Sequence, residues 1–132
     1  MNNFKVFLKY WLPVLAWAGV IFYFSSLPDL KSGFEPTIDF ILRKAAHMIE
    51  FGILACLFLR IGFCHEKSEN MKYIFLLAIL FSILYAVTDE YHQSFVAGRE
   101  MAVRDILIDG VGTVLGSSLY LLFKRKGNYN LK

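Results

Sequence analysis

Long apolar blocks, separated by short polar segments, dominate the pattern of the sequence. They predict helices over roughly residues 10–27, 43–63, 71–88 and 104–123. Each block has close to the ~20 residues that an α-helix needs to cross a bilayer. None shows the polar stripe of a soluble amphipathic helix or the alternation of a membrane barrel strand. We therefore predict an all-α fold, an integral membrane bundle of four transmembrane helices, as a single domain over residues 1–132.

Composition favours this interpretation over its main alternative, a compact soluble helical bundle with an unusually apolar surface. Hydrophobic residues make up 57% of the chain and charged residues only 19%. Helices that are apolar on all sides are normally buried or membrane-spanning. The first block is expected to be a retained helix, because the segment Ser25–Pro28 that follows it is a poor signal-peptide cleavage site.

The distribution of basic residues predicts the orientation. With the N-terminus inside, nine of the 14 lysines and arginines lie in inner segments and five in outer segments. This bias follows the positive-inside rule. We expect a multi-pass protein of the bacterial cytoplasmic membrane with both termini cytoplasmic (N-in/C-in). The net charge of +3 then reflects a basic inner rim, and no nucleic-acid binding is predicted from it.

Ionisable residues recur at one depth of the bundle. His47 and Glu50 belong to the second predicted helix, Asp89 follows the third, and Asp105 and Asp109 open the fourth. Counted from the inner helix ends, all five lie about 21–28 Å along the helix axis. The hydrocarbon core is about 30 Å thick, so these groups should form one layer near the outer boundary.

The last predicted helix carries this layer on its packing face. Asp105 and Asp109 share one side, which Gly112 and Gly116 continue. Two small residues four positions apart let another helix approach closely, so the carboxylates should point into the bundle. Two interpretations remain open: a network that only locks the helices, or a site open to the outside. In the first, four basic residues would neutralise the acids, namely Arg43, Lys44, Arg99 and Arg104.

These same segments resemble the motifs of the VanZ-like family. Arg43–Phe51 is similar to its Lys-x-x-His-x-x-Glu-Tyr signature, and Asp89–Arg99 to its Asp-Glu-x-x-Gln-x-Phe-x-Pro-Gly-Arg loop. Asp105–Gly112 matches the opening of its last helix, and Phe24–Pro28 its first outer turn. The resemblance covers about residues 11–122.

The resemblance implies a four-helix membrane protein that acts at a bacterial cell envelope. The family is named after a membrane protein that gives low-level resistance to the glycopeptide antibiotic teicoplanin, but the resemblance supplies no reaction. Phe51 stands where the family usually has tyrosine, and Ala97 where it usually has proline. Any role for a hydroxyl at position 51 is lost, but neither departure removes a group that is charged at neutral pH.

The first functional hypothesis is an envelope protein without catalytic activity. Its outer polar layer would bind a lipid, a lipid-linked cell-wall precursor or a lipoglycopeptide antibiotic. Arginine suits a phosphate or carboxylate because it can bind either in bidentate fashion. Tyr91, Phe95 and Phe34 would cover an apolar tail. The candidate ligand-binding residues are Lys44, Gln93, Arg99 and Arg104.

The second hypothesis is a membrane-embedded hydrolase or transferase acting on a lipid-linked envelope substrate. Histidines and carboxylates one helical turn apart could act as general acid and base. No cofactor is predicted, although His47, Glu50 and Asp109 form a weak candidate set for a divalent metal. A serine nucleophile at Ser25, Ser26 or Ser94 is a further option. The candidate catalytic residues are His47, Glu50, Asp89, Glu90, His92, Asp105 and Asp109.

The third hypothesis is a small transporter or a partner-binding subunit. Four helices are few for a transporter, and no inverted repeat is evident. A homo-oligomer would overcome that limit. The stripe of Gly112 and Gly116 fits packing within the chain as well as self-association.

Overall fold

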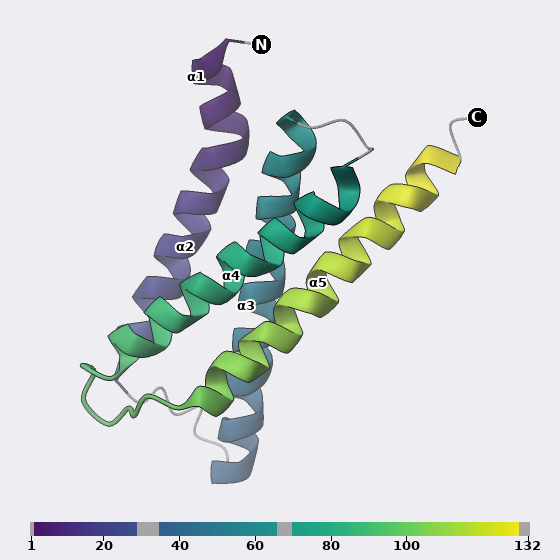
Figure 1. Cartoon of the computed structure of the whole chain (residues 1–132). Coiled ribbons are helices and arrows are strands. Elements are labelled where there is room, and N and C mark those ends of the chain that lie inside the picture. Colours follow the sequence, from purple (N-terminus) through teal and green to yellow (C-terminus); the bar gives the residue numbers. More distant parts are fainter. Residues whose placement is uncertain (1, 29–34, 66–69, 130–132) are drawn as a thin grey trace.

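The computed structural model describes residues 2–28, 35–65 and 70–129, and these residues form helices and no strand. Figure 1 shows the helices running back and forth, with both chain ends at the same end of the bundle. The elements are α1 (Asn3–Val6), the π-helical turn η1 (Phe7–Trp11), α2 (Leu12–Ser25), α3 (Pro36–His65), α4 (Met71–Gln93) and α5 (Val103–Tyr129).

The prediction of an all-α bundle with four membrane-spanning helices is confirmed. Four helices are long and apolar enough to cross a membrane, over Asn3–Ser25, Pro36–Cys64, Met71–Gln93 and Val103–Arg125. Large apolar side chains are exposed along all of them, as a lipid environment allows. The orientation of the termini across the membrane stays a prediction.

Helix boundaries differ from the predicted ranges. α3 begins at Pro36 rather than near residue 43, because proline fits the first turn of a helix, where its missing N–H costs nothing. α4 continues to Gln93 rather than 88, since the polar side chains of its last turn find partners inside the bundle. α5 continues to Tyr129 rather than 123, and basic residues are favourable near a helix C-terminus.

The first span is longer than predicted and contains a widened turn. α1, η1 and α2 form one continuous helical segment from Asn3 to Ser25, where the pattern predicted 10–27. The N–H of Leu12 bonds to the carbonyl of Phe7, five residues back. This turn lies just before Pro13, whose ring and missing N–H interrupt regular α-helical bonding.

The closest helix contact joins α3 to α5 through glycines. A Cβ on Gly112 would collide with the backbone of Met48, and a Cβ on Gly116 would lie 2.6 Å from the Cα of Gly52. The thiol of Cys56 adds a hydrogen bond of 3.4 Å to the carbonyl of Gly116. The stripe predicted to be a packing face is therefore in contact with α3.

The α2 helix is held against α3 and α4 by aromatic donors and a small apolar cluster. Trp17 Nε1 donates to the carbonyl of Glu50 at 2.9 Å. The Tyr85 hydroxyl donates to the carbonyl of Ala18 at 2.7 Å. The buried cluster between these helices consists of Val14, Ile21, Phe51, Leu54 and Ala86. These contacts fix the rotation of α2 and so determine which of its residues reach the polar layer.

Candidate functional site

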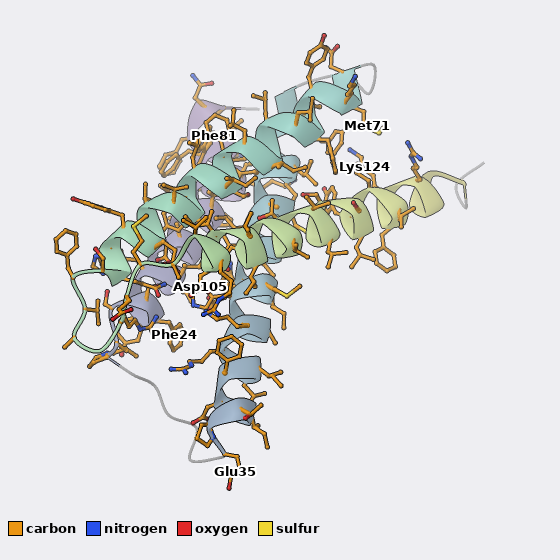
Figure 2. The ribbon with its side chains drawn as sticks, turned by 60° about the horizontal axis from the view of Figure 1, so that its bottom comes forward. Phe24, Glu35, Met71, Phe81, Asp105 and Lys124 are labelled. Atoms are coloured by element: carbon orange, nitrogen blue, oxygen red, sulfur yellow. The ribbon has the colours of Figure 1, made fainter. Side chains whose placement is uncertain are left out.

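The polar layer lies at the end of the bundle where α2 and α4 end and α3 and α5 begin. We call this the loop end; it is opposite the chain termini (Figure 1). In Figure 2, Phe24 and Asp105 lie toward the loop end, whereas Met71 and Lys124 lie at the other end. Three acids are almost fully buried here: Asp89 is 3% exposed, and Glu90 and Asp109 are each 1% exposed.

Asp89 is the centre of a hydrogen-bonded chain that joins α2, α4 and the α4–α5 connection. Its Oδ2 accepts from the Ser25 hydroxyl at 2.8 Å and from Gln93 Nε2 at 2.8 Å. Arg99 Nη1 donates to Gln93 Oε1 at 2.9 Å. The arginine is thus held in place by an amide whose own position depends on the buried carboxylate.

Gly98 allows the chain to turn back so that Arg99 can reach Gln93. Its φ of 80° lies in the left-handed region that other residues rarely adopt. The N–H of Arg99 bonds to the carbonyl of Val96 at 3.1 Å, which closes this turn. The turn therefore forms with Ala97 in place of the family's usual proline.

Ion pairs join α3 to α5. Lys44 Nζ on α3 pairs with Asp105 Oδ2 on α5, and within α5 Arg104 Nε lies 3.6 Å from Asp105 Oδ1. His47 Nδ1 lies 3.5 Å from Asp109 Oδ1, a distance too long for a strong hydrogen bond. Asp105 is therefore neutralised by basic residues as the locking interpretation expected. Asp109 instead has a histidine beside it.

The remaining candidates organise the end of α4. Glu90 Oε2 accepts from the N–H of Ala102 at 3.1 Å, which holds the segment leading into α5. The His92 ring stacks on Phe22 with centroids 4.3 Å apart. Its Nε2 lies 3.0 Å from the hydroxyl oxygen of Ser26. The two contacts of His92 lie on the α2 side of the layer.

Two hollows open among these residues. The smaller cavity, of about 300 Å³, is lined by Phe24, Ser25, Arg43, Ala46, His47, Glu50 and Arg99. The charged cavity, of about 520 Å³, is lined by Phe40, Arg43, Lys44, His47, Gln93, Gly98, Arg99, Glu100, Arg104 and Asp105. They share Arg43, His47 and Arg99, so they adjoin.

The candidate residues divide between these cavities and the core behind them. All four proposed ligand-binding residues line the charged cavity, as Asp105 and His47 do. Glu50 lines the smaller one with His47. The other four candidate catalytic residues line neither: Asp89, Glu90, His92 and Asp109.

Among the residues of the cavity walls that were not predicted to bind a ligand are Arg43, Ser25 and Phe40. Arg43 could have been found from its spacing, one helical turn before His47 on the same face. Phe40 lies under two cations, with Lys44 Nζ and the guanidinium of Arg104 each 5.4 Å from its ring centroid. Phe34, named as an aromatic cover, lies outside the described residues.

Among residues 2–28, 35–65 and 70–129, no three His, Cys, Asp or Glu side chains are grouped so that they could hold a metal ion. His47 and Asp109 are neighbours, but Glu50 does not complete a site with them. A divalent metal stays a prediction that no contact supports.

The fold and the polar end together define a multi-pass helical membrane protein with a charged cavity at one end of its bundle. The family model described as VanZ/LLP1 matches residues 7–124, nearly the whole chain. The chain belongs to this family, as its motifs indicated. No curated protein and no solved structure matches the chain.

Proposed function

We propose that this chain is a bacterial cell-envelope protein whose loop end faces outward and binds an envelope ligand, contributing to protection against teicoplanin. The ligand is a lipid, a lipid-linked cell-wall precursor or the lipoglycopeptide itself. The observation that carries the proposal is the pair of adjoining cavities, both lined by Arg43 and Arg99.

The side chains around these cavities suit an amphiphile with an acidic group. Arg99 is held by Gln93, so its guanidinium binds a phosphate or carboxylate with little further ordering. Tyr91 and Phe95, at and just after the end of α4, pack edge to face with centroids 5.1 Å apart, and both are largely exposed. They offer apolar surface to an acyl chain or an aromatic ring at the same end of the bundle.

Teicoplanin susceptibility tests this proposal. A Gram-positive host would express the wild-type chain, Arg99→Gln or Arg125→Gln, each at matched membrane abundance. Arg125 is exposed at the opposite end of α5 and serves as the control for loss of one positive charge. We expect protection from the wild type and from Arg125→Gln and its loss with Arg99→Gln. Equal protection by all three chains would exclude a role for the cavities.

A membrane-embedded hydrolase or transferase is the second candidate, and the Ser26–His92 contact favours it. A hydroxyl that donates to an imidazole is the arrangement of an activated nucleophile. The Ser26 hydroxyl lies 3.0 Å from His92 Nε2 but donates to the carbonyl of Phe22 at 2.6 Å, so it would have to turn toward the imidazole to act in this way. Purified protein would be assayed for hydrolysis of a lipid-linked diphosphate, with Ser26→Ala and His92→Gln as variants. This candidate requires turnover by the wild type that both substitutions abolish; turnover that survives either one would count against it.

A further inference from the structure

The smaller cavity at the loop end combines opposite charges with apolar walls. Arg43 and Arg99 supply positive charge, Glu50 supplies negative charge, and Phe24 and Ala46 are apolar. Its volume is about 300 Å³, many times the space that one water molecule needs. It can therefore hold a small charged group, and its walls distinguish the two ends of a dipolar one.

Glu50 differs from the other acids of the polar layer. Asp89, Asp105 and Glu90 each contact a donor, and Asp109 lies beside His47. The Glu50 carboxylate makes no hydrogen bond or ion pair with any residue that the structure describes, although Glu50 lies within electrostatic range of His47, Asp89, Asp109 and Arg99. Its side chain is half-buried against the cavity. It is thus the acid of this layer that faces the hollow.

The smaller cavity borders the lipid-facing side of α3. Ala46, in its wall, is exposed, and its neighbours one turn away on the same face, Leu42 and Ile49, are 47% and 62% exposed. Phe24, on the α2 wall, is also 45% exposed. A headgroup can therefore occupy the cavity while its hydrocarbon chains stay against this apolar face.

We propose that the smaller cavity binds the headgroup of a zwitterionic phospholipid that carries a primary ammonium group. Arg43 and Arg99 would bind the phosphate, and Glu50 the ammonium. Such charge-assisted hydrogen bonds are strong where water is partly excluded. Glu50 would disfavour a phosphate headgroup without an ammonium, because its own charge would then be unpaired beside an anion. This inference rests on the proposed function for the idea that the loop end binds an envelope ligand, and it names the class of that ligand.

Native mass spectrometry of the full-length protein in detergent tests the assignment. The probes are phosphatidylethanolamine, phosphatidylglycerol, which lacks the ammonium, and soluble phosphoethanolamine. We expect phosphatidylethanolamine to bind about tenfold more tightly than phosphatidylglycerol, the size of effect that one charge-assisted hydrogen bond gives. Equal binding of the two lipids would overturn the proposal. If soluble phosphoethanolamine bound as tightly as phosphatidylethanolamine, the proposal that the ligand is a lipid would be overturned.

Substitutions test the binding of the ammonium and of the phosphate separately. Glu50→Gln should bring phosphatidylethanolamine down to the level of phosphatidylglycerol, while Arg99→Gln should weaken both lipids by a similar factor. Glu35→Gln removes an exposed acid at the start of α3 that lines neither cavity, and it should change nothing. If Glu50→Gln does not fold, Glu50→Asp should lower the preference in part. A full preference in either Glu50 variant would refute the role of this residue.

Failure of this lipid-binding inference can be distinguished from failure of the proposed function. Lipid selectivity is measured on purified protein, whereas antibiotic protection is measured on cells with Arg99→Gln. Loss of lipid selectivity with protection intact would refute only this inference. Selective lipid binding by a chain that gives no protection would refute only the antibiotic role.

Discussion

His47 on α3 and Asp109 on α5 face each other inside the bundle, with Nδ1 and Oδ1 3.5 Å apart and Asp109 only 1% exposed. Neither Asp109 oxygen has a hydrogen-bond partner among the residues that the structure describes. A carboxylate buried in this way depends on the nearby imidazole, because removing one partner of a buried pair leaves the other unpaired.

The first prediction is that His47 and Asp109 are energetically coupled. His47→Gln should lower the free energy of unfolding by about 2–3 kcal/mol, because it removes the group beside a buried acid. Adding Asp109→Asn should recover about 1 kcal/mol or more, since the acid that lost its partner is then neutral. A double-mutant cycle from unfolding in detergent measures this coupling. Strictly additive effects would show that the two side chains do not interact.

The second prediction concerns the glycine contact between α3 and α5. Gly112→Ala should destabilise the protein by about 2–4 kcal/mol, because its methyl group would collide with the backbone of Met48, which cannot rotate away. Gly110→Ala is the matched control on the same helix, since a Cβ there meets nothing within 4 Å. The control should be neutral or stabilising by up to about 1 kcal/mol. Thermal unfolding in detergent measures the stability of both variants. Equal melting temperatures for Gly112→Ala and Gly110→Ala would contradict the packing argument.

The third prediction concerns a buried hydroxyl. Thr113 is fully buried, and its Oγ1 has no hydrogen-bond partner within the described part of the chain. Thr113→Val keeps the shape and removes the polar atom, so it should raise stability by about 1 kcal/mol. Thr88 is the control, because its exposed hydroxyl donates to the carbonyl of Tyr85 at 2.7 Å, and Thr88→Val should change little. A loss of stability in Thr113→Val would mean that the hydroxyl is satisfied by a bound water or ion.

The sequence predicted the features that helical periodicity controls. The spacing of Asp105, Asp109, Gly112 and Gly116 fixes one face of α5, and the length of the apolar blocks fixes the number of spans. Depth along each helix likewise follows from rise per residue, so the common level of the polar groups could be expected.

Which side chains hydrogen-bond to one another within the polar layer could not be predicted in the same way. Ser25 reaches Asp89 only because Trp17 and Tyr85 fix the rotation of α2. Arg99 reaches Gln93 only because Gly98 adopts a positive φ. These contacts depend on helix ends and a loop, where helical periodicity does not tell in which direction a side chain points.

The last prediction is the orientation of the chain. Basic residues should keep the terminal end in the cytoplasm, and the loop end should then be outside. Replacing Cys56 and Cys64 and adding a single cysteine at Glu100 or at Arg125 places a thiol at either end of the bundle, because both positions are exposed. A membrane-impermeant maleimide applied to intact cells should label Glu100→Cys and leave Arg125→Cys unlabelled until the cells are opened. The reverse labelling would place the charged cavity in the cytoplasm, where it could not meet an external antibiotic, and the proposed function would have to be abandoned.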